Sequence, residues 1–118
     1  MKEGAYRESR MAWLQCKDTL QKKQHPFALQ KALTTVGRDA GNDLVLADPA
    51  IRPSHATILR KGSSFTVSLT DRKGELYVNG KRTSKASMND GDQLLIGAWQ
   101  LTFHEGPMEP VASQEGED

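Results

Sequence analysis

Short runs of β-branched and apolar residues, separated by turn-forming residues, follow one another along most of this 118-residue chain. No long stretch repeats its apolar residues with the helical period of 3.6. The breaks between runs fall at Gly, Pro, Asn and Asp, which favour reversals of the chain. Strands that recur at such a spacing are typical of two antiparallel sheets packed face to face. The sequence therefore predicts an all-β fold, an antiparallel β-sandwich.

The first third of the chain is expected to supply two strands and one turn. Residues 11–20 fit either a short helix or a strand, and their alternation favours the strand that begins the sandwich. Residues 21–26 are expected to be a polar turn. Residues 27–36 alternate with one partly apolar face, as a half-buried strand requires.

The last half of the chain contains two hairpin signals. Residues 56–59 and 65–69 predict two strands joined by a turn that contains Gly62. Asn79-Gly80 is a strong hairpin-turn signal of its own. The remaining expectations are a loop at 81–88, a turn at 90–92 and strands at 76–78, 93–96 and 99–103.

Residues 35–60, TVGRDAGNDLVLADPAIRPSHATILR, form the stretch around which the chain is organised. Two short strands bracket Arg38, and Gly41-Asn42 suits positive backbone angles. Pro49 and Pro53 fix φ and end regular pairing on either side of Ile51.

Four short motifs carry a resemblance to a known family. Gly37-Arg38, the run NDLVL at 42–46, His55-Ala56 and Val78-Asn79-Gly80 resemble the forkhead-associated (FHA) domain over residues 13–103. The resemblance implies a sandwich of about eleven strands, with loops at one end that form the binding site.

FHA domains bind phosphothreonine peptides, and the resemblance implies a role for each matching residue. Arg38 matches the arginine that contacts the phosphate, and a guanidinium is a rigid fork of donors suited to phosphate oxygens. Gly37 is expected to let the chain turn so that Arg38 faces the loops. His55 is expected to be a scaffold residue, and Asn79 and Gly80 are expected to be architectural.

Two positions depart from the family pattern. Arg52 stands where a serine usually helps to hold the phosphate, and residues 72–75 read RKGE where the pattern has Ser-x-Asn-Gly. Losing a neutral hydroxyl donor removes about 0.5–1.5 kcal/mol, whereas a well-placed arginine adds about 1.5–3 kcal/mol. Two outcomes stay open: a more basic anion site, or a site that has lost its ligand. The candidate binding residues are Arg38, Arg52, Ser54, Arg72 and Lys73.

The leading hypothesis is a phosphothreonine-binding signalling module of bacterial type that regulates an attached or partner protein. The alternative is a degenerate FHA scaffold for phosphate-independent docking or self-association. A phosphorylated partner is expected under the first hypothesis, and Ser9 makes the chain's own N-terminal arm a candidate. A fused output domain is a further expectation from the resemblance.

Neither catalysis nor a cofactor is expected. Ser54 and His55 are adjacent and would point to opposite faces of a strand, so they do not form a nucleophile and base. The histidines and the single cysteine, Cys16, lack metal-ligand spacing. Gly37 is not part of a nucleotide-binding glycine run.

The charge of the chain is unevenly distributed along the sequence. From Glu105 onward the chain has five acidic residues and no Lys or Arg, which leaves +6 on residues 1–104 out of an overall +1. A basic body favours an anionic partner. The basic pairs lack interleaved aromatic residues, so nucleic acid is not expected. With no apolar membrane span and one cysteine, the expectation is a cytoplasmic protein.

The expected domain organisation has three parts. Residues 1–10 are expected to be a flexible arm, and residues 11–105 the FHA β-sandwich. Residues 106–118 are expected to be an acidic tail or a linker to a further domain.

Overall fold

The computed structural model describes residues 11–106, and in this range every regular element is a β-strand. The predicted all-β sandwich, with about eleven strands, is confirmed. The strands are β1 (Ala12–Asp18), β2 (Lys23–Ala28), β3 (Leu33–Gly37), β4 (Leu44–Val45), β5 (Ala56–Lys61), β6 (Ser64–Leu69), β7 (Tyr77–Val78), β8 (Lys81–Arg82), β9 (Lys85–Met88), β10 (Gln93–Ile96) and β11 (Trp99–Glu105).

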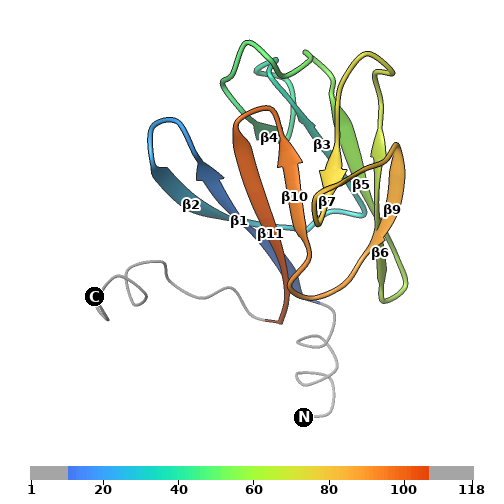
Figure 1. Ribbon diagram of the computed structural model, residues 1–118. Helices are drawn as coiled ribbons and strands as arrows, with labels where there is room; N and C mark the ends of the chain where they lie inside the picture. The colour runs from blue at the N-terminus through green and yellow to red at the C-terminus, as the bar shows by residue number, and fades with distance from the viewer. Residues whose placement is uncertain (1–10, 107–118) are drawn as a thin grey trace, which may run out of the picture.

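The strands form two sheets that face each other (Figure 1). One sheet has six strands in the order β2-β1-β11-β10-β7-β8, and the other has five in the order β4-β3-β5-β6-β9. Pairing is antiparallel except between β3 and β4, which run parallel for two residues.

Alternating side chains of both sheets fill the space between them. Leu14 and Cys16 of β1 and Leu101 and Phe103 of β11 are fully buried, while Gln15 and Thr102, which lie between them along the strands, are less buried. Phe65 of the second sheet meets the ring of Phe103 with centroids 5.1 Å apart. Each such apolar side chain contributes about 1.5–3 kcal/mol when it leaves water. This core fixes the ends of the strands and so the loops that join them.

Both predicted hairpins are present. β5 and β6 pair along six residues around the turn that contains Gly62, whose φ is +65°. Asn79 and Gly80 join β7 to β8 with φ of +54° and +83°, the pair of positive angles expected of a type I′ turn.

The turn predicted at residues 21–26 is wrong from Lys23 onward. Residues from Lys23 onward form β2, which pairs with β1 at the edge of its sheet. Pro26 lies within this strand, where an edge position tolerates a residue without a backbone N–H. These polar residues can form a strand because β2 lies at the edge of the sheet, where one side of its backbone needs no hydrogen-bonding strand.

The single strand predicted at residues 27–36 is also wrong. β2 ends at Ala28, and the chain crosses to the other sheet before β3 begins at Leu33. In β3 the buried side chains are those of Thr34 and Val36, and Leu33 is 47% exposed. The crossing shifts the alternation, because Leu29 before it is buried and Leu33 after it faces outward.

The loop predicted at residues 81–88 contains two strands. β8 completes the hairpin from β7, and β9 then pairs with β6 in the other sheet. The segment carries few apolar residues because both strands lie at sheet edges.

The two ends of the described chain meet. The N–H of Gly106 donates a 2.7 Å hydrogen bond to the carbonyl oxygen of Met11. Both ends lie opposite the loops that join β3 to β4, β4 to β5 and β6 to β7 (Figure 1). The expected arm with Ser9, and the expected tail beyond Gly106, lie outside the described residues. Between residues 11 and 106 there is no helix of the length and apolarity that a membrane crossing requires.

Candidate functional site

Three loops and one turn lie together at one end of the sandwich, called here the loop end (Figure 1). The loops are residues 38–43, 46–55 and 70–76, and the turn is residues 97–98. All five predicted binding residues lie in these loops. Asn79 and Gly80 do not, because Asn79 bonds to Asp92 and Gln93 at the opposite end of β10. Their predicted architectural role agrees with these contacts.

Gly37 ends β3 against the backbone of the second loop. A Cβ at residue 37 would overlap the carbonyl oxygen of Pro53 and lie 2.7 Å from Nδ2 of Asn42. The N–H groups of Arg38 and Asp39 donate to the carbonyl oxygens of Arg52 and Pro53, at 3.0 and 3.2 Å. A glycine is therefore required by close approach of two backbones.

Asn42 ties the first loop to the second through its side chain. Its Nδ2 donates to the carbonyl oxygens of Asp39 and Pro53, at 2.9 and 2.7 Å. Neither Gly41 nor Asn42 has a positive φ, so that expectation is wrong. The loop uses Asn42 for its side-chain amide and not for a positive φ.

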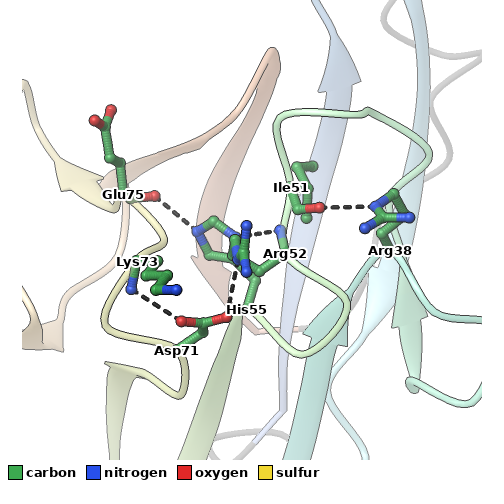
Figure 2. Close-up of polar contacts among 7 residues, drawn as sticks. All are labelled: Arg38, Ile51, Arg52, His55, Asp71, Lys73 and Glu75. Atoms are coloured by element: carbon green, nitrogen blue, oxygen red, sulfur yellow. Dashed lines mark hydrogen bonds and ion pairs between the residues drawn. The ribbon is translucent and has the colours of Figure 1, made fainter.

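Arg38 is anchored through one of its three nitrogens. Its Nε donates a 2.9 Å hydrogen bond to the carbonyl oxygen of Ile51, while the residue remains exposed (Figure 2). Within residues 11–106 no acceptor bonds to the two terminal Nη atoms. The guanidinium is thus oriented by the fold, with two donor groups left for a ligand.

Arg52 is anchored in the same manner by a different acceptor. Its Nε donates to Oδ2 of Asp71 at 2.9 Å, and the two side chains are 41% and 29% exposed. The other carboxylate oxygen of Asp71 accepts the N–H of Lys73 at 2.9 Å. The hydrogen bond from Arg52, and then that from the Lys73 backbone, hold the pKa of Asp71 below its usual value.

His55, which is expected to be a scaffold residue, lies buried between the second and third loops. The ring is 1% exposed, its Nδ1 accepts the N–H of Arg52 at 3.0 Å, and its Nε2 faces the carbonyl oxygen of Glu75 at 2.8 Å. Because Nδ1 meets a donor, the ring hydrogen must be on Nε2. The imidazole therefore joins the second loop to the third and has no nitrogen free to act as a base for Ser54.

Gly74 allows the third loop to pack closely against His55 of the second loop. A Cβ at residue 74 would lie 2.8 Å from Cε1 of His55 and 3.1 Å from Cγ of Arg52. The stem of Arg52 therefore passes beside the His55 ring where Gly74 leaves room.

Asp48 stabilises the second loop through both oxygens of its carboxylate. Its Oδ1 accepts the N–H of Ala50 at 2.9 Å, and its Oδ2 accepts the N–H of Ala98 at 2.7 Å. Gly97, with a φ of +59°, lies against Ile51 and Asp48. The loop that carries Arg52 is thereby bonded to the turn between β10 and β11.

Four of these residues were missed by reasoning on the sequence alone. Asp48 had a local signal, since an Asp before Pro favours a side-chain turn of the kind seen here. Asp71 had none, because its partner Arg52 is distant in sequence. For Gly74 and Gly97, no local pattern indicated that they make close contacts with other loops.

The structure separates the five predicted binding residues into two groups. Arg38 lies on one side of the backbone at Ile51, and Arg52 reaches toward Asp71 and Lys73 on the other (Figure 2). Arg72, Lys73 and Ser54 are exposed, and their side chains form no hydrogen bond with other residues of the described range 11–106. In the part of the chain that the structure describes, no group of three His, Cys, Asp or Glu side chains is placed to hold a metal ion. The arrangement can bind an anion.

Comparisons with known proteins agree on one family. The sequence model of the FHA domain matches residues 34–97. The chain is 33% identical over 81 residues to the oxoglutarate dehydrogenase inhibitor of Corynebacterium diphtheriae, covering 69% of this chain and 57% of that protein. It is 30% identical over 92 residues to the glycogen accumulation regulator GarA of Mycobacterium tuberculosis, covering 78% and 53%. The chain thus spans about half the length of these relatives.

A solved structure gives the same result. Mycobacterium tuberculosis EmbR, in complex with a low-affinity phosphopeptide, superposes with a TM-score of 0.70 and 25% identity. The match covers 92% of this chain and 30% of that one.

Proposed function

Because the chain belongs to the FHA domain family, we propose that it binds phosphothreonine peptides at its loop end and thereby regulates a partner or attached protein. The observation that carries the proposal is the anchoring of Arg38. Its Nε is held by the carbonyl oxygen of Ile51, and its two Nη groups remain for the ligand.

The chemistry of Arg38 suits a phosphate better than a carboxylate. A phosphothreonine carries between one and two negative charges near neutral pH and presents three acceptor oxygens. Two parallel N–H···O bonds from a guanidinium that is already oriented lose little side-chain entropy on binding. Arg38 therefore supplies both the attraction and the geometry.

The regulatory part of the proposal rests on the relatives. One is named an inhibitor of an enzyme and another a regulator of glycogen accumulation. A binding module without catalytic groups of its own acts in this manner, by holding or releasing a partner. We place the action in the cytoplasm, where the thiol of Cys16 stays reduced.

Calorimetric titration tests the binding proposal. The domain is titrated with a degenerate phosphothreonine peptide pool and with the same pool unphosphorylated. Arg38→Ala should weaken binding at least about 100-fold, since two charge-assisted hydrogen bonds are lost. Arg38→Lys keeps the charge but loses the fork, so it separates attraction from geometry. Equal binding of the phosphorylated pool by the native chain and Arg38→Ala would refute the proposal.

A second candidate function, self-association through a sandwich face, has one specific observation in its favour. Leu33 and Leu59 are cross-strand partners on the outer face of the β4-β3-β5-β6-β9 sheet, and they are 47% and 45% exposed. Val45 at the edge of this face is 42% exposed. The outward positions of β3, β5 and β6 are Leu33, Thr35, Thr57, Leu59, Lys61, Ser64, Thr66 and Ser68.

The charged side chains at the outward positions of β3, β5, β6 and β9 are Lys61 and Lys85, so this face has few charges to oppose contact with a second copy of itself. Light scattering over a range of concentrations measures this. Leu33→Ser with Leu59→Ser should lower the association, whereas Leu95→Ser, an exposed leucine of the other sheet, should not. A monomer at every concentration would exclude this candidate.

A further inference from the structure

Arg38 and Arg52 are held in the same way, and this shared geometry bears on how many anionic groups a ligand can place at the loop end. Each guanidinium donates through Nε to a protein oxygen at 2.9 Å, the carbonyl of Ile51 for one and Asp71 for the other. Across the described part of the chain, neither arginine has a protein acceptor at its Nη atoms. The loop end therefore presents two oriented forks of donors, where a single phosphate group needs only one.

The two forks point to different places. The side chain of Arg38 lies beyond the Ile51 carbonyl, and that of Arg52 lies beside the His55 ring, toward the third loop (Figure 2). The backbone of residues 51–52 passes between them. One phosphate on Arg38 would leave the Nη groups of Arg52 for a second acceptor.

Asp71 offsets one of the three positive charges on the Arg52 side. Both of its oxygens are already engaged, one by Arg52 and one by the N–H of Lys73. Arg72 and the Lys73 amine add two exposed positive charges in the same loop. The carboxylate of Glu75 is turned away from Asp71 and Lys73 in Figure 2. This side of the loop end keeps a net positive charge.

There is also room for a ligand group on this side. A hollow of about 250 Å³ is lined by Ala50, His55, Lys73, Glu75 and Gly97. It lies between the second loop, the third loop and the turn after β10.

We propose that this domain selects phosphothreonine peptides that carry a second anionic group, which binds Arg52 together with Arg72 or Lys73. The second group is a carboxylate of Asp or Glu, or another phosphate. The inference rests on the proposed function, since Arg38 holds the first phosphate. Arg52 is a specificity residue here, and Asp71 is the positioning residue that orients it.

The test compares three peptide sets by calorimetry. The first set contains one phosphothreonine with neutral neighbours, and the second has Asp or Glu scanned through the four positions on each side. The third replaces the acidic residue with a second phosphorylated residue. We expect the best acidic or doubly phosphorylated peptide to bind about tenfold more tightly than the neutral peptide, the gain of one charge-assisted pair.

Variants show whether this gain belongs to Arg52. In Arg52→Gln the ratio of affinities between the best acidic peptide and the neutral phosphopeptide should fall to about twofold or less. Lys61→Gln removes the same charge near the turn between β5 and β6, at the other end of the sandwich, and should keep the full gain. An equal gain in the native chain and Arg52→Gln, or no gain at any position, would overturn the inference.

The two proposals fail in different ways. Arg38-dependent binding of the neutral phosphopeptide without any acidic gain leaves the proposed function standing and rejects only the second anion. Failure of every phosphopeptide to bind rejects both.

Discussion

Gly74 lies so close to the imidazole of His55 that a Cβ on residue 74 would fall 2.8 Å from Cε1 and 2.9 Å from Nε2. The ring is held at both nitrogens, so it has little freedom to move aside. Gly74→Ala should lower the free energy of unfolding by about 1–3 kcal/mol, the usual result of overpacking. Denaturant unfolding measures it.

Gly41→Ala is the matched control for this change. Gly41 lies in the neighbouring loop, has no positive φ, and no atom lies within 4 Å of the Cβ position. Its substitution should change stability by less than about 0.5 kcal/mol, or increase it slightly. Equal losses in the two variants would show that residue 74 is sensitive as a loop glycine and not through His55.

Asn42→Ala should loosen the first loop from the second. The change removes the two hydrogen bonds to the carbonyl oxygens of Asp39 and Pro53. We expect a loss of about 1–3 kcal/mol in the free energy of unfolding. Hydrogen exchange should show lower protection of the Arg38 N–H, which bonds across the same joint. Unchanged protection of this N–H would contradict the role given to Asn42.

The thiol of Cys16 should make the fold sensitive to alkaline pH. Burial raises the pKa of Cys16 from 9.0 to about 12, because the thiolate would lose its hydration. Above pH 9 the unfolded chain releases this proton and the native chain keeps it, so stability falls as pH rises toward 12. The slope is at most about 1.4 kcal/mol per pH unit.

Cys16→Ala isolates this contribution, because lysines and tyrosines also titrate at high pH. The difference in unfolding free energy between the native chain and Cys16→Ala should shrink above pH 9. A constant difference up to pH 11 would show that the thiol ionises equally in both states.

Asp71 should make the free energy of unfolding depend on pH in the acid range. Its pKa is lowered by the hydrogen bond from Arg52 and by the Lys73 N–H, from an ordinary value of 3.8. As pH falls below 3.8, the unfolded chain takes up the proton before the native chain does, so the contribution of Asp71 is lost in this window. Asp71→Asn should lack this part of the acid dependence when unfolding is compared from about pH 5 to about pH 2. Parallel curves would contradict the assignment.

The hairpins and the alternating central strands could be predicted because their signals are local. Asn79-Gly80 and Gly62 determine reversals by their own backbone angles. β2 and β9 were missed for a common physical reason. Both are edge strands, so half of their backbone needs no partner and their side chains need not be apolar.

The site was predictable only where one residue carries the chemistry. Arg38 follows from its motif, and its anchor on Ile51 lies in the same stretch of chain. The ion pair between Arg52 and Asp71 joins two loops that are separated by the β5–β6 hairpin. Such a pair depends on tertiary packing, and no pattern in the sequence marks it.

The hydrogen bond between Gly106 and Met11 bears on whether the domain can bind a phosphate on its own N-terminal arm. β1 begins beside this bond at Ala12 and ends at Asp18, near the loop end, which is a span of about 20 Å at the usual rise of a strand. Ser9 precedes Met11 by two residues, which reach at most about 7 Å. Since this reach is shorter than the span of β1, we expect a phosphate on Ser9 to favour Arg38 of a second copy over Arg38 of its own molecule, so that the phosphorylated chain associates as its concentration rises.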